Sequence, residues 1–119
     1  MVNQPCIISA VDHVIEPPDI WTRRLAKNKF ADRIPHLERA ADGSDLWTVD
    51  GRKFPLGTIA RVGALMNDRV RIPTRWEEIP KAAYDPAARL TAMDEDGVDC
   101  TILYPSLGGF SGEIFARIG

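Results

Sequence analysis

The chain has 119 residues, of which 45% are apolar and 27% charged, with a formal net charge of −2 at pH 7. This length predicts one domain with a modest core. Basic and acidic residues are mixed, which argues against a nucleic-acid partner, because binding to a phosphate backbone depends on clustered Lys and Arg. The sequence shows neither a cleavable apolar leader nor a run of about 18 apolar residues. We therefore expect a cytoplasmic protein without a membrane partner.

The two cysteines and one of the two histidines are expected to have structural roles. Cys6 and Cys100 lie far apart in the sequence, each in an apolar run. Free cysteine is among the most buried residue types, so we expect two buried, reduced thiols rather than a disulfide. His36 follows a proline in an irregular stretch and is expected to be a surface or hydrogen-bonded residue.

Polar residues follow the first apolar run of the chain. Residues 6–11 are nearly all apolar or small, which is typical of a strand covered on both faces, as in a parallel sheet. Ligands of parallel α/β folds bind beyond the carboxyl ends of the strands, where Asp12, His13 and Glu16 fall. Carboxylate and neutral imidazole groups bind zinc and similar divalent ions, so these three residues are candidate metal ligands. The alternative is that Asp12 and His13 only cap strand and loop backbone.

A long excursion, residues 17–83, separates this strand from the next regular unit. Its expected elements are short helices within 19–41, tight turns at Asp42-Gly43 and Asp50-Gly51, a strand hairpin of 46–49 with 52–54, and irregular chain over 55–80. The excursion is too long for a simple connection. It is either a surface insertion with its own apolar cluster, or a lid or subunit contact through which the protein forms homo-oligomers.

The clearest predicted element is a helix after Asp85. Asp85 is its N-cap, Pro86 takes the first helical position and Gly97 closes it. Leu90 and Met93, three residues apart, are expected to form its buried stripe.

A strand, a loop and a further helix are expected after this helix. They cover residues 98–104, 107–112 and 113–118, and the loop is rich in glycine. Strand, helix, strand, loop and helix begin a repeating βαβ series. Two parallel strands do not complete a sheet, because their edges and faces stay uncovered. We therefore expect an α/β fold of which this chain is an N-terminal fragment.

Two blocks of the sequence resemble the amidohydrolase-related family, the branch of the amidohydrolase superfamily that includes the aminocarboxymuconate-semialdehyde decarboxylase-like enzymes. Residues 8–21, ISAVDHVIEPPDIW, are similar to the opening of that family, and residues 84–99 are similar to its first barrel helix and second strand. The resemblance spans most of residues 6–113. It implies that residues 1–119 are the N-terminal part of a (β/α)8 TIM barrel, with residues 17–83 as a long insertion after the first strand.

The resemblance also implies a metal site and a reaction class. It implies a divalent metal ion, usually zinc, at the C-terminal face of the barrel, and hydrolysis or non-oxidative decarboxylation of a small organic acid. His13 matches the second member of the family's first-strand ligand pair, but the first member falls on Val11, which cannot bind a metal. Asp12 can replace it only where the strand bends, because residues 11 and 13 share a strand face; Glu16 can instead reach back from the loop. The remaining ligands would lie beyond residue 119, so the fragment alone is expected to be inactive.

A second class of function stays open at this point. The chain is alternatively a small α+β binding or interaction domain without metal or catalysis. Val11 favours that alternative, whereas the order and spacing of the two matching blocks favour the enzyme.

Overall fold

The computed structural model describes residues 6–59, 65–66, 69–70, 72–107 and 116. Its elements in chain order are β1 (Ile8–Val14), α1 (Lys27–Phe30), η1 (Ala31–Arg33), β2 (His36–Arg39), β3 (Asp45–Val49), β4 (Arg52–Pro55), α2 (Leu56–Ile59), β5 (Leu65–Met66), β6 (Arg69–Val70), η3 (Trp76–Glu78), η4 (Lys81–Ala83), α3 (Pro86–Asp96) and β7 (Cys100–Pro105). None of the described helices is long and apolar enough to cross a membrane. The predicted glycine-rich loop at 107–112 and helix at 113–118 lie outside the described residues, apart from Leu107 and Ala116.

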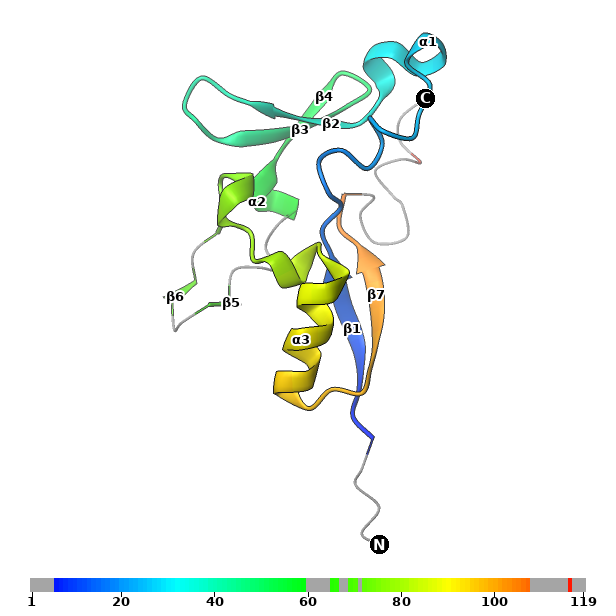
Figure 1. Ribbon diagram of the computed structural model, residues 1–119. Coiled ribbons are helices and arrows are strands. Elements are labelled where there is room, and N and C mark those ends of the chain that lie inside the picture. The colour runs from blue at the N-terminus through cyan, green and yellow to red at the C-terminus, as the bar shows by residue number, and fades with distance from the viewer. Residues whose placement is uncertain (1–5, 60–64, 67–68, 71, 108–115, 117–119) are drawn as a thin grey trace, which may run out of the picture.

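Strands β1 and β7, from the beginning and the end of the described chain, pair in parallel as a two-stranded sheet (Figure 1). Its pairs are Ile8 with Cys100, Ser9 with Thr101, Asp12 with Leu103, His13 with Tyr104 and Val14 with Pro105. The step from residue 9 to 12 in β1 therefore matches the step from 101 to 103 in β7, so β1 carries a one-residue bulge. Because of the bulge, Asp12 rather than Val11 lies opposite Leu103.

Helix α3 has the predicted ends but not the predicted burial. The Asp85 carboxylate accepts the Ala88 N–H at 2.8 Å, and Gly97 closes the helix at φ 70°. The expected stripe of Leu90 and Met93 is wrong, since Leu90 is 61% exposed and α3 has no buried residue. The sheet beside α3 has only two strands, β1 and β7. Because neighbouring strands lie about 5 Å apart, this sheet is too narrow to bury one face of a helix.

Within the described chain, the first strand is not covered on both faces as predicted. Apolar side chains of the β1–β7 pair and its entry are 42% to 65% exposed, namely Ile7, Ile8, Val11, Ile102 and Leu103. Cys6 and Cys100 are free thiols and are exposed, not buried as predicted. A two-stranded sheet with one neighbouring helix cannot cover both of its faces, which explains this exposure.

A three-stranded antiparallel sheet, β2–β3–β4, forms the main part of the insertion. The predicted hairpin is confirmed as β3 and β4, joined by a turn with Asp50 and Gly51 at φ 49° and 75°. The turn at Gly43, with φ 82°, is confirmed as well. Strand β2 was not predicted, because its sequence HLER has no alternating apolar pattern and depends on pairing with β3.

The helices expected before β2 are only partly present. Residues 27–33 form the short helices α1 and η1. The helix expected after Asp19 is replaced by separate turns, in which the Arg23 N–H donates to the Asp19 carbonyl at 3.0 Å and the Leu25 N–H to the Trp21 carbonyl at 2.8 Å.

One apolar cluster joins the insertion to the parallel strands. Its buried members are Ile15, Trp47, Val49, Leu56, Ile79, Ala83 and Leu107. Ile15 directly follows β1 and Leu107 lies just beyond β7, whereas the other members belong to the insertion. The Ile15 N–H also donates to the Ala83 carbonyl at 2.9 Å. The insertion therefore packs onto the carboxyl ends of β1 and β7, where Figure 1 shows the β2–β3–β4 sheet.

A buried charge connects this sheet to η3. Asp45 is almost fully buried and accepts the Arg39 Nε at 2.6 Å and the Trp76 N–H at 2.7 Å. Arg39 also donates to Glu77 at 2.8 Å. A buried carboxylate is tolerated when it is paired and hydrogen-bonded, so this network fixes the register between the sheet and η3.

Candidate functional site

His13 and Tyr104 lie side by side at the carboxyl end of the parallel strands. They are register partners, their ring centroids are 6.2 Å apart, and the ring planes are inclined at 47°. The Arg89 guanidinium on α3 donates through Nη2 to the His13 carbonyl oxygen at 2.7 Å. Strand pairing from one side and Arg89 from the helix therefore fix the backbone that carries the His13 imidazole.

Asp12 is held by the neighbouring strand, away from His13. The Thr101 hydroxyl donates to the Asp12 carboxylate. This hydrogen bond is the largest cause that holds the pKa of Asp12 below its ordinary value of 3.8, with smaller contributions from Ser9 and Arg89. Consecutive residues of a strand point to opposite faces, so Asp12 faces Thr101 while His13 faces Tyr104.

Glu16 is buried in the loop after β1. It is 8% exposed, and its two carboxylate oxygens accept the Leu107 N–H at 3.1 and 2.9 Å. Ile15 and Leu107 on either side of this bond are fully buried. The carboxylate thus ties the loop after β1 to the loop after β7.

The three predicted metal ligands are not brought together. Within the described ranges, no group of three or more His, Cys, Asp and Glu side chains is arranged to hold a metal ion. The Asp12 carboxylate accepts a hydrogen bond from the Thr101 hydroxyl, and the Glu16 carboxylate accepts one from the Leu107 N–H. The described residues therefore do not fit a metal ion by themselves, and a metal site that includes His13 stays a prediction.

Several residues at the carboxyl ends of β1 and β7 were not predicted from the sequence as part of the candidate site. Arg89, Thr101 and Tyr104 contact the predicted ligands from α3 and β7. Ser106, one residue beyond β7, has a buried Oγ without a hydrogen-bond partner in the described structure. The signal that could have found them is their place on the second strand and its helix, because parallel strands end at the same edge of a sheet.

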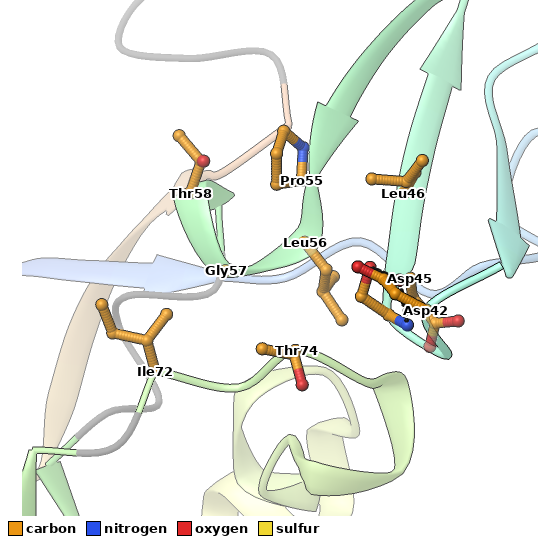
Figure 2. Close-up of a pocket in the computed structure, with 10 residues that line it drawn as sticks. Asp42, Asp45, Leu46, Pro55, Leu56, Gly57, Thr58, Ile72 and Thr74 are labelled. Atoms are coloured by element: carbon orange, nitrogen blue, oxygen red, sulfur yellow. Dashed lines mark hydrogen bonds between the residues drawn. The ribbon is translucent and has the colours of Figure 1, made fainter. Parts of the chain in front are cut away.

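A cavity of about 490 Å³ lies within the insertion, and Figure 2 shows its lining. Its walls come from the β2–β3 turn, β3, the β4–α2 junction and the segment after residue 71, with Asp42, Asp45, Leu56, Gly57, Ile72 and Thr74 among the lining residues. Asp45 is bound by Arg39 and Trp76, and an Asp42 oxygen accepts the Ser44 N–H and hydroxyl at 2.9 and 2.7 Å. These carboxylates serve the fold of the hairpin.

His36 lies apart from the strand ends, on β2. Its Nδ1 is 2.8 Å from the Ile34 carbonyl oxygen and its Nε2 is 3.0 Å from Glu38 Oε1. The prediction of a hydrogen-bonded histidine is confirmed, although Glu38 was not foreseen as its partner.

Comparison with known proteins adds no family assignment. No protein-family model matches the chain, and a search of curated protein sequences finds no match. Function is therefore inferred from the two resembling sequence blocks and from the geometry at the ends of β1 and β7.

Proposed function

We propose that the chain is the first part of a metal-dependent hydrolase or non-oxidative decarboxylase of the amidohydrolase-related type, which acts on a small organic acid. One observation carries the proposal: β1, α3 and β7 form a parallel βαβ unit that brings His13 and Tyr104 to the same carboxyl end, with ring centroids 6.2 Å apart. Enzymes with parallel α/β folds bind their ligands at this end.

The exposed apolar surface of the parallel pair supports the proposal. Ile8 and Val11 of β1 and Ile102 and Leu103 of β7 are all exposed. An isolated Leu or Ile in solvent is ordinary, but several exposed apolar residues on two paired strands are expected to be covered by another layer. The further strands and helices of a barrel would supply such a layer on both sides.

His13 is the residue of the described chain that we assign to the metal ion, which would polarise a substrate oxygen or a bound water. Its other ligands would come from outside the described residues, because Asp12 and Glu16 are engaged by Thr101 and Leu107. The described residues have simpler tasks. Arg89 fixes the backbone of His13, Tyr104 packs beside its ring, and the Thr101 hydroxyl binds the Asp12 carboxylate and lowers its pKa.

A small α+β binding domain without a metal is the second candidate. Val11 stands at the position of the family's first ligand and is 65% exposed, in the bulge of β1. The described side chains, moreover, form no group of three ligands. Both observations favour a domain in which the end of β1 binds rather than reacts.

Elemental analysis of the purified full-length protein tests the proposal. The chain has two histidines, so His13→Ala is compared with His36→Ala as a matched control. We expect about one equivalent of zinc or another divalent ion in the wild type and in His36→Ala, and a strong loss in His13→Ala, because that substitution removes a ligand from the metal ion. A wild-type protein that carries no metal and takes up none when supplied would contradict the proposal and favour the binding domain.

A further inference from the structure

Ser106 carries a buried hydroxyl that the fold leaves unused. Its Oγ is shielded from solvent and has no hydrogen-bond partner in the part of the chain that the structure describes. Nearly all buried polar atoms in proteins have a partner, and an exception asks for a reason such as a ligand, a water or a catalytic task. Burial of an unsatisfied hydroxyl lowers the stability of the folded protein, unless a ligand or a water molecule accepts or donates a hydrogen bond there.

The backbone on both sides of Ser106 is fixed. Pro105 precedes it and pairs with Val14 as the last residue of β7. Leu107 follows it, with a fully buried side chain and with its N–H bound to both oxygens of Glu16. The backbone that carries the Ser106 hydroxyl is therefore held in place from both sides. A fixed backbone of this kind favours a preorganised hydrogen-bond donor.

Ser106 directly follows β7, the strand that carries Tyr104 of the candidate site. It lies two residues beyond Tyr104, the register partner of His13, at the carboxyl ends of both parallel strands. The loop of Glu16 and the apolar cluster of the insertion pack around the same end. A ligand bound at the carboxyl ends of both strands would therefore lie close to the segment that carries Ser106.

We propose that Ser106 is a substrate-binding residue whose hydroxyl donates a hydrogen bond to a carboxylate oxygen of a small organic acid. The choice of a small organic acid as the ligand rests on the proposed function. The observation that the Ser106 hydroxyl has no partner in the described structure is independent of that function. A serine hydroxyl has one hydrogen to donate, and an ionised carboxylate only accepts. A hydrogen bond to a charged acceptor is roughly twice as strong as a neutral one, so the carboxylate offsets the cost of the buried hydroxyl.

Benzoate is the probe for this proposal. The full-length protein is titrated with sodium benzoate, at constant ionic strength maintained with sodium chloride, while the amide signals of Ser106 and Leu107 are followed by NMR. We expect saturable shifts of both signals in the wild type and an affinity about tenfold lower in Ser106→Ala, the loss typical of one hydrogen bond to a charged group. Ser44→Ala is the matched control, because that hydroxyl is bound by Asp42 in the β2–β3 turn, and we expect wild-type affinity there.

Stability separates a binding role from a structural one. Removal of an unpartnered buried hydroxyl is neutral or stabilising, so Ser106→Ala should keep the protection of the Leu107 amide and unfold at the same or a higher denaturant concentration. Wild-type affinity in Ser106→Ala, or a wild type that shows no saturable benzoate shift, would overturn the proposal. Neither result bears on the metal content of the His13 and His36 variants, which tests the proposed function separately.

Discussion

Both carboxylate oxygens of Glu16 accept the backbone N–H of Leu107, at 3.1 and 2.9 Å, across 91 positions of the sequence. The bond joins the loops that follow β1 and β7, and it lies at the edge of the apolar cluster that contains Ile15 and Leu107. Glu16 was predicted as a metal ligand, but its geometry gives it the task of holding two loops in register. The shape of the candidate site therefore depends on a carboxylate that is engaged by the backbone of Leu107.

Replacement of Glu16 should destabilise the fold. Glu16→Ala leaves the Leu107 N–H buried without an acceptor, so we expect a loss of about 2 kcal/mol in the free energy of unfolding, and a smaller loss for Glu16→Gln, which keeps one acceptor oxygen. Chemical denaturation measures the loss, and hydrogen exchange of the Leu107 amide locates it. Glu95→Ala, an exposed glutamate on α3, serves as the control and should stay within about 0.5 kcal/mol of the wild type. Equal stability of Glu16→Ala and Glu95→Ala would refute the assignment.

Trp47 should be the most sensitive core position of the insertion. Its side chain is fully buried, and the Trp21 ring packs edge-on against it at a centroid distance of 5.5 Å. Trp47→Ala is expected to cost about 3–5 kcal/mol, as other large-to-small aromatic changes do in a core. Leu90→Ala on α3 should cost far less, because that side chain is mostly exposed. Urea unfolding of both variants decides the point, and a comparable loss in Leu90→Ala would show that α3 is covered by something further.

The acidity of Asp12 should depend on Thr101. The Thr101 hydroxyl is the largest cause of the lowered pKa of Asp12, so Thr101→Val should raise that pKa toward 3.8. A carboxylate with a lowered pKa stabilises the fold above its unfolded pKa, and this contribution is lost as the pH falls through the folded pKa. The carboxyl carbon signal of Asp12, followed by NMR against pH, measures the change. Thr91→Val is the control, since that hydroxyl bonds the Ala87 carbonyl on α3, and it should leave Asp12 unchanged.

Glu38 should govern part of the acid unfolding of the insertion. The Lys53 ammonium, 2.8 Å from Glu38 Oε2, is the first cause that lowers the pKa of Glu38 from 4.5 to about 2, and His36 adds to it. The stabilisation is complete above pH 4.5 and is lost as the pH falls toward 2. Lys53→Met should raise the pKa of Glu38 and move the acid transition to higher pH. Lys81→Met on η4 controls for the loss of one positive charge; an identical transition in both lysine variants would rule out a specific role for the Lys53 pair.

The parts of the fold that sequence predicted are those with local causes. Asp85, Pro86 and Gly97 carry the signals that start and end α3, and the hairpin turn follows from Asp50 and Gly51, which adopt positive φ. Strand β2 has no such signal, because its pairing with β3 decides its conformation. The burial of Leu90 was predicted wrongly for a related reason: a periodic pattern shows which face is apolar but not whether another layer covers it.

The place of the candidate residues along the first strand was predicted, but their contacts were not. Asp12 and His13 lie at the end of the first strand as expected, and Glu16 follows in the loop. The bulge before Asp12 and the bond from Leu107 to Glu16 depend on residues about 90 positions away, which spacing in one segment cannot reveal. Long-range pairing therefore decides which of the three candidates faces Tyr104, and that residue is His13.

The most direct test is NMR of the histidine rings, labelled with nitrogen-15, in the full-length protein before and after addition of zinc. The ring of His36 is observed beside that of His13 as an internal control. We predict that a ring nitrogen of His13 shifts by tens of ppm on binding while His36 keeps its signals, because its ring nitrogens face the Ile34 carbonyl and Glu38. If the His13 ring stays unchanged while zinc is in excess, the metal-dependent enzyme is contradicted and the end of β1 belongs to a binding domain.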